Sequence, residues 1–157
     1  MAESTSLPGT LVEPEDLIAL GFVPHDLDFG QHVEWPGGTG IEWATLGQVP
    51  DSAGVYLFTI GDGDVVHVAY VGLTTHLWMV TKGHLPHSGG ARGGQRYGKP
   101  RHAGVTRKRV NALIAQQVDA GRTVQHWLRE LPRDLIVDEE DRLIHLWSTR
   151  STGWNIG

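Results

Sequence analysis

Residues 54–72 read Gly-Val-Tyr-Leu-Phe-Thr-Ile-Gly-Asp-Gly-Asp-Val-Val-His-Val-Ala-Tyr-Val-Gly, and no other segment says more about the architecture. Two apolar runs, 55–60 and 65–71, are rich in the β-branched and aromatic residues that favour strands. The Gly-Asp-Gly-Asp sequence at 61–64 separates them and favours a tight turn. The stretch therefore predicts an antiparallel hairpin.

The two tyrosines of this hairpin constrain its register. Alternate residues of a strand share one face. If Tyr56 pairs with Tyr70, the hairpin is symmetric about Gly63 and both hydroxyls lie on one side. A two-residue turn at Asp62-Gly63 would shift the register and send the tyrosines to opposite faces. A site that uses both tyrosines therefore predicts an odd-numbered turn.

The residues before the hairpin predict little regular structure. Pro14, followed by acids and ended by Gly21, predicts a short helix. Residues 1–10 are expected to form a disordered tail. Residues 22–50 are rich in Pro and Gly and predict loops. Trp35 and Trp43, within that stretch, are expected to pack as core or lid aromatics.

The residues after the hairpin predict two longer helices and one strand. Thr74 or Thr75 is expected to cap a short helix, and residues 83–104 predict a long loop. Thr106 begins an amphipathic pattern that Gly121 ends. Residues 122–128 alternate as a third strand, and residues 137–147 predict a last helix.

This order of elements predicts an α+β fold with a small, mainly antiparallel three-stranded sheet flanked by helices. With 157 residues and no internal repeat, the chain is long enough for one core. Residues 43–157 are expected to form the domain. Residues 1–42 are expected to be an acidic N-terminal helical and loop extension.

Charge is distributed unevenly along the chain. Residues 1–81 carry eleven Asp or Glu and no Lys or Arg, and residues 82–109 carry eight basic residues and no acid. Clustered cations favour a polyanionic partner even where the net charge is −5, although a solvated basic loop would show the same pattern.

Cysteine is absent, which excludes disulfides and thiolate metal sites. No apolar run is long enough to span a membrane, and no secretory signal is visible, so we expect a cytoplasmic protein. Nothing indicates the oligomeric state.

Five short motifs, in order, resemble the GIY-YIG nuclease family over about residues 43–157. Gly54-Val55-Tyr56 and Tyr70-Val71-Gly72 are similar to the two tripeptides that name the family. Glu140-x-x-Leu-Ile is similar to its metal-binding glutamate on a late helix. Residues 153–155, Gly-Trp-Asn, are similar to its closing motif, and residues 106–122 resemble a helix and turn of one bacterial branch.

The resemblance implies roles for four residues. Tyr56 would be the general base, or its relay, for the attacking water, and Tyr70 would contact the scissile phosphate or that water. A free phenol with a pKa of about 10 needs cationic or metal neighbours to act at neutral pH. Asn155 would hold the C-terminal segment or orient a tyrosine or a metal ligand. Glu140 would bind a single Mg²⁺ or Mn²⁺.

Helical spacing supports an inward position for Glu140, because it lies three and four residues before two apolar residues. A buried carboxylate is costly unless it is paired or bound to a metal. Hard oxygen ligands suit Mg²⁺ or Mn²⁺, and one well-placed carboxylate favours a one-metal mechanism. Glu139 and Asp141 are expected to turn away as solvated charges.

The chain departs from the family at Val80, where the family usually has an arginine that grips the phosphate. A guanidinium is not replaced by an apolar side chain. The possible substitutes, in order of preference, are Arg107, Arg101 and Arg96. Cations expected to contact the nucleic-acid backbone are Lys82, Lys99, Lys108 and Arg109.

Histidine side chains titrate near neutral pH and could therefore supply a second proton-transfer group. The candidates are His84 and His102. The spacing of His84 and His87 would also suit two ligands of a zinc site, but the sequence lacks a full ligand set. The run 93–99 resembles a phosphate-binding loop, but Pro100 follows its lysine where a helix should begin, which excludes that function.

These observations predict a Mg²⁺-dependent endonuclease-like domain acting on nucleic acid, DNA rather than RNA by family habit. Two other classes of function remain open. A nucleic-acid-binding module of the same fold that has lost cleavage would account for Val80. A regulatory or structural protein could use the acidic N-terminal half to bind a partner.

Overall fold

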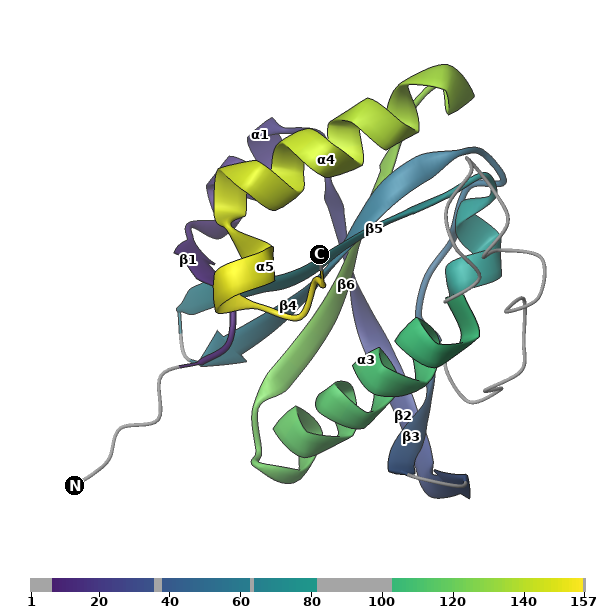
Figure 1. Cartoon of the computed structure of the whole chain (residues 1–157), viewed down its shortest axis with the longest axis vertical. Helices are drawn as coiled ribbons and strands as arrows, with labels where there is room; N and C mark the ends of the chain where they lie inside the picture. The colour runs from purple at the N-terminus through teal and green to yellow at the C-terminus, as the bar shows by residue number, and fades with distance from the viewer. Residues whose placement is uncertain (1–6, 36–37, 63, 82–102, 157) are drawn as a thin grey trace.

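The computed structural model describes residues 7–35, 38–62, 64–81 and 103–156, which form one six-stranded sheet with helices on both faces (Figure 1). The strands are β1 (Thr10–Val12), β2 (Val23–Trp35), β3 (Gly38–Thr45), β4 (Gly54–Asp62), β5 (Val65–Thr74) and β6 (Thr123–Glu130). The helices are α1 (Pro14–Ala19), α3 (Ala103–Asp119), α4 (Ile136–Trp147) and α5 (Thr149–Thr152), with short 3₁₀ turns η1 (Leu77–Val80) and η3 (Arg133–Leu135). The fold class is therefore α+β, as the order of elements predicts.

The sheet has the strand order β1-β5-β4-β6-β2-β3, and all its pairs are antiparallel. The prediction of a three-stranded sheet is wrong, because the sheet has six strands. The three predicted strands are β5, β4 and β6, which lie next to one another in it. The prediction of loops over residues 22–50 is also wrong, because β2 and β3 lie there. β2 ends at Trp35, which pairs with Gly38 at the start of β3.

The hairpin of β4 and β5 reaches the expected side-chain arrangement by a different route. Asp62 pairs with Val65, so two residues separate the strands and the prediction of an odd-numbered turn is wrong. The register then shifts between Phe58 and the next residue, where Phe58 pairs with Tyr70 and one residue of β5 is left over. Tyr56 thus pairs with Gly72 and not with Tyr70, but the β-bulge at Ala69 returns both tyrosines to one face of the hairpin.

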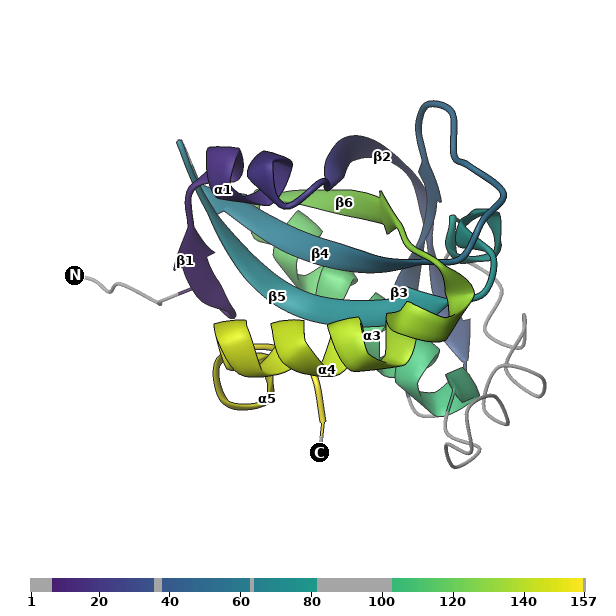
Figure 2. The ribbon, with the colours of Figure 1, turned by 90° about the horizontal axis from the view of Figure 1, so that it is seen from above.

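Two core clusters lie on opposite faces of the sheet, as strand alternation requires. Val55 and Leu57 of β4 pack with the inward side of α4 in the first cluster. Phe58 and Ile60 of the same strand pack with α3 in the second cluster. Figures 1 and 2 show α4 running alongside β5, with α3 further down the sheet towards β3.

Residues 7–35 and 38–42 contribute to the same sheet and core. β1 pairs with β5, and β2 pairs with β6 before it turns to pair with β3. Leu17 of α1 and Phe22 are buried in the first core cluster, where the Phe22 ring lies 6.5 Å from that of Trp147. The predicted helix after Pro14 therefore acts as a cover for one end of the sheet.

The later helices agree with the sequence pattern within a few residues. α3 begins at Ala103, three residues before the predicted cap, and α4 begins at Ile136. Trp43 of β3 is a core residue, exposed by only 7%. In the part of the chain that the structure describes, no helix is long and apolar enough to cross a membrane.

Candidate functional site

Tyr56 and Tyr70 lie on the same face of the β4–β5 hairpin, and their ring centroids are 6.2 Å apart. Both pack against the core cluster on the α3 side of the sheet, and both remain partly accessible. Tyr56 pairs across the strands with Gly72. A side chain at Gly72 would come closer than 3.0 Å to the Tyr56 ring, so glycine is required for the ring to lie across β5.

The C-terminal segment holds the bulged part of β5 in place. The Trp154 backbone N–H donates to the carbonyl of Ala69, the bulge residue, at 2.7 Å. The Asn155 side chain pairs with Val71 twice: its amide nitrogen donates to the Val71 carbonyl, and its oxygen accepts the Val71 N–H, each at 2.9 Å. A side chain at Gly153 would collide with the Ala69 backbone.

These contacts explain the Gly-Trp-Asn sequence of residues 153–155 in physical terms. Its glycine permits close approach to β5, its tryptophan is buried in the core, and its asparagine replaces a strand partner beyond the end of β1. Because Val71 lies between Tyr70 and Gly72, Asn155 fixes the backbone on both sides of it. Asn155 therefore holds the C-terminal segment and, through the backbone, positions Tyr70.

Five rings form an aromatic cluster around the tyrosines, consisting of Trp43, Tyr56, Phe58, Tyr70 and His126. His126 stacks on Phe58 with centroids 4.6 Å apart and an interplanar angle of 9°. Tyr56 meets the His126 ring edge to face at 5.2 Å, and Trp43 meets it similarly at 5.6 Å. Such arrangements are the favourable geometries for aromatic pairs.

His126 is a buried histidine with one unpartnered nitrogen. It lies on β6, is fully buried, and its Nδ1 is 2.9 Å from the Thr45 hydroxyl. Its Nε2 and the nearby Trp43 Nε1 are buried and have no hydrogen-bond partner in the part of the chain that the structure describes. Burial lowers the pKa of His126 from 6.5 to about 3, and the charge of His25 on β2 adds to this effect.

The sequence prediction did not include His126, although a signal for it exists. In the predicted strand over residues 122–128, His126 alternates with Val124 and Leu128 and so falls on an apolar face. A histidine at such a position is expected to be buried. It also completes a cross-strand row in which His25, His126, Phe58 and Tyr70 lie opposite one another.

Glu140 lies on the inward side of α4, as its helical spacing predicts, and is exposed by only 9%. Its helical neighbours Leu143 and Ile144 belong to the core cluster on the α4 side, whereas the tyrosines belong to the cluster on the α3 side. The prediction that Glu139 is a solvated charge is wrong. Its carboxylate bonds to Arg129 and Arg142, and these bonds lower its pKa.

The position where the resemblance predicts an arginine holds a buried side chain, Val80. Val80 ends η1 and is exposed by 5%, so a guanidinium there would have to enter the core. On α3, Lys108 is partly buried, and Arg109 donates through Nη2 to the carbonyl of Trp154. Arg109 therefore braces the C-terminal segment.

Several predicted site residues lie outside the described residues, together with residues 1–6 of the predicted tail and residues 83–102 of the predicted loop. These site residues are Lys82, His84, Arg96, Lys99, Arg101 and His102, along with the zinc and phosphate-loop alternatives at residues 84–99. Arg107 lies on the described backbone of α3, with its side chain outside the description. The tail prediction is wrong for its last residues, because Leu7 packs against the core and Thr10 begins β1.

Within residues 7–35, 38–62, 64–81 and 103–156, no three His, Asp or Glu side chains are grouped so as to hold a metal ion. Comparison of the chain with family models, with curated proteins and with solved structures finds no match.

Proposed function

We propose that this chain is a Mg²⁺-dependent endonuclease-like hydrolase of the GIY-YIG type, acting on nucleic acid, and on DNA rather than RNA. The observation that carries the proposal is the placement of Tyr56 and Tyr70 on one face, with Gly72 leaving space for the Tyr56 ring. Three separate features produce this placement: the bulge, the glycine, and the C-terminal segment bonded to β5.

The tyrosines would divide the work on the phosphodiester. Tyr56 accepts a proton from the attacking water, directly or through a second water, and Tyr70 hydrogen-bonds to the phosphate. A tyrosine with an ordinary pKa of about 10 is protonated at neutral pH and accepts a proton only as the phenolate, so positive charge close to Tyr56 is required to lower that pKa. We assign that charge to a cation of the basic run, with Arg107, Arg101 and Arg96 as the candidates. His84 is the candidate for a further proton-transfer group.

The metal ligand in this proposal is Glu140. Glu140 is exposed by only 9% on the inward side of α4, and the resemblance gives its carboxylate the role of metal ligand. Mg²⁺ commonly binds through one or two carboxylates and keeps several waters, which suits a site with one protein carboxylate. Glu140 lies on the α4 side of the sheet and the tyrosines on the α3 side, so the ion would have to lie at the edge of β5 to supply charge stabilisation for the departing oxygen.

Cleavage of supercoiled plasmid in Mg²⁺ or Mn²⁺ tests the proposal. We expect Tyr56→Phe and Glu140→Gln each to slow cleavage by about 100-fold or more, as loss of a general base or a metal ligand does. Glu139→Gln is the matched control, because it neutralises the adjacent carboxylate on the same helix, which is engaged by two arginines. Equal rates for the Glu139 and Glu140 variants would contradict the metal assignment.

A second function, nucleic-acid binding without cleavage, is favoured by one observation. The usual position of the phosphate-gripping arginine is a buried valine in a short 3₁₀ turn. A wild-type protein that binds DNA with strong salt dependence, yet cuts neither DNA nor RNA in either metal, would establish this second function in place of the first.

A further inference from the structure

η1, which follows the tyrosine-bearing strand β5, carries a half-exposed tryptophan on a rigid support. Trp78 is exposed by 53%, whereas Trp43, Trp127, Trp147 and Trp154 are each exposed by 7% or less. A large ring left half in water is a common element of binding surfaces, because it offers much apolar area with little loss of side-chain freedom.

The turn that presents Trp78 is held from both sides. Leu77 is fully buried and Val80 nearly so, and the Leu77 N–H donates to the Ser52 carbonyl at 2.8 Å. The Thr81 hydroxyl donates to the Trp78 carbonyl at 2.8 Å, and the Thr81 carbonyl accepts the Thr45 N–H from β3. The backbone of Trp78 is therefore fixed in advance of any binding event.

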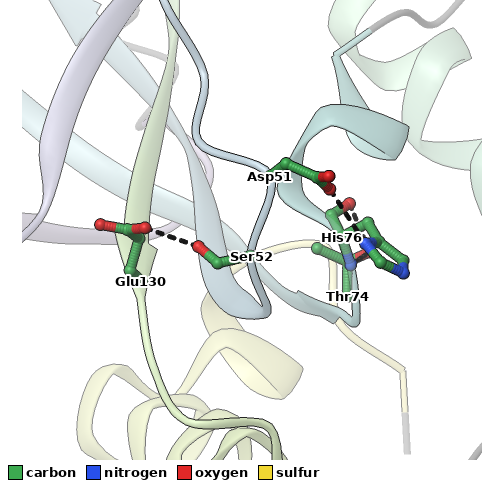
Figure 3. A network of polar contacts seen from close by, with 5 residues as sticks. All are labelled: Asp51, Ser52, Thr74, His76 and Glu130. Atoms are coloured by element: carbon green, nitrogen blue, oxygen red, sulfur yellow. Dashed lines mark hydrogen bonds and ion pairs between the residues drawn. The ribbon is translucent and has the colours of Figure 1, made fainter.

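His76 forms a second ring beside it, with centroids 6.2 Å apart. The Asp51 carboxylate lies 3.0 Å from His76 Nδ1 and orients the imidazole, and the His76 N–H donates to the Thr74 hydroxyl (Figure 3). His76 and Trp78 thus make a preorganised aromatic pair, half-exposed on both members.

The charges around this pair indicate which part of a nucleotide it would contact. The carboxylates near it are Asp51, bonded to His76, and Glu130, bonded to the Ser52 hydroxyl (Figure 3). Among the described residues, these two carboxylates disfavour a phosphate directly beside His76 and Trp78. An aromatic face accepts any base through stacking, without a requirement for positive charge.

The pair also lies at a useful distance from the tyrosines. His76 follows Gly72, beside the Tyr56 ring, by four positions, which corresponds to at most roughly 14 Å at about 3.4 Å per residue. A nucleotide flanking a phosphate at Tyr56 would reach that far. We propose that Trp78, with His76 beside it, stacks against an unpaired base of the nucleic-acid strand, so that the preferred ligand is single-stranded or locally unstacked. This inference rests on the proposed nucleic-acid function.

Fluorescence anisotropy with labelled oligothymidylate, the same strand bearing abasic sites, and a duplex, all in EDTA, tests the inference. We expect Trp78→Ala to weaken single-strand binding about 5- to 150-fold, the effect of losing one stacked base. The slope of affinity against salt should stay unchanged, since stacking releases no counterions. Trp78→Phe should restore much of the binding, and the abasic strand should bind wild type and Trp78→Ala alike.

Leu146→Ala is the matched control, because Leu146 is exposed to a similar extent, 54%, on α4. Equal binding by wild type and Trp78→Ala would overturn the inference, and so would an equal loss on the abasic strand. Self-association of the wild type that Trp78→Ala abolishes, without change in oligonucleotide affinity, would assign the ring to a protein contact and also overturn it. If wild type binds no oligonucleotide or duplex, the proposed function itself fails, which is a different result.

Discussion

Replacement of His126 by phenylalanine should make the stability of this protein less sensitive to acid. The imidazole is fully buried, stacks on Phe58, and has an unpartnered Nε2. Burial holds its pKa at about 3 in the folded protein, against 6.5 for an exposed histidine. The native state therefore keeps His126 neutral over a pH range in which the unfolded chain binds a proton.

The sign and size of the effect follow from linkage. Between pH 6.5 and about 3 the unfolded state binds more protons than the native state, so the free energy of unfolding falls as pH falls through that window. Each pH unit below 6.5 costs about 1.4 kcal/mol. From about pH 7.5 to about pH 5, His126 should remove about 2 kcal/mol of stability.

Chemical denaturation of wild type and His126→Phe at both pH values measures this quantity. The variant should lose about 2 kcal/mol less than wild type on acidification, because phenylalanine does not titrate. Its stability near pH 7.5 should change little, since loss of the Thr45 hydrogen bond is offset by removal of a buried unpaired nitrogen.

An exposed histidine provides the control for this experiment. His145 is 68% exposed on α4, and His145→Gln should leave the difference between the two pH values unchanged. If wild type and His126→Phe lose the same free energy on acidification, or if His126 titrates near pH 6.5 by NMR in the folded protein, the reasoning about its burial is refuted.

Two further variants test the geometry around the tyrosines. Gly72→Ala should displace the Tyr56 ring and destabilise the protein by about 1–3 kcal/mol. Gly61→Ala on β4 is the control and should change the ring position and the stability much less, because its added carbon would meet its nearest neighbour at 3.6 Å. Equal shifts in melting temperature for the two variants would contradict the close contact at Gly72. Asn155→Ala removes both bonds to Val71 and should lower the free energy of unfolding by about 2–4 kcal/mol in urea titrations, and a loss below about 0.5 kcal/mol would show that water replaces the amide.

The sequence predicted the centre of the fold better than its edges. Two apolar runs identified the strands that became β4 and β5, and alternation identified the strand that became β6. Helical spacing identified α4 with Glu140 on its inward side. β2 and β3 were missed because proline and glycine were taken as signs of loops. Pro24 lies within β2, opposite Trp127, and glycines begin or interrupt β3, where tertiary pairing outweighs local propensity.

The tyrosine face was predicted correctly from an incorrect turn. Local sequence does not specify the bulge at Ala69, because the bulge depends on contacts from residues more than eighty positions away. Only the folded chain brings Trp154 to the Ala69 carbonyl and leaves no room for a side chain at Gly153. Long-range backbone pairing of this kind has no periodicity that a single sequence displays.

The contacts of Glu139 and His126 could not be predicted from the sequence either. Glu139 was expected in solvent because its helical position points away from Glu140, yet Arg129 on β6 lies within bonding distance of it. His126 could have been identified from its apolar strand face, but its ring contacts with Tyr56 on β4 and Trp43 on β3 depend on the strand order of the folded sheet.

The most direct test of the central proposal is the single-turnover rate of plasmid nicking in Mg²⁺ by wild type and by Tyr56→Phe, which removes only the hydroxyl. We expect wild type to nick DNA in a metal-dependent manner and the variant to be slower by about 100-fold or more, with an unchanged fold. Equal nicking by both proteins, or nicking by wild type that EDTA does not stop, would contradict the proposal.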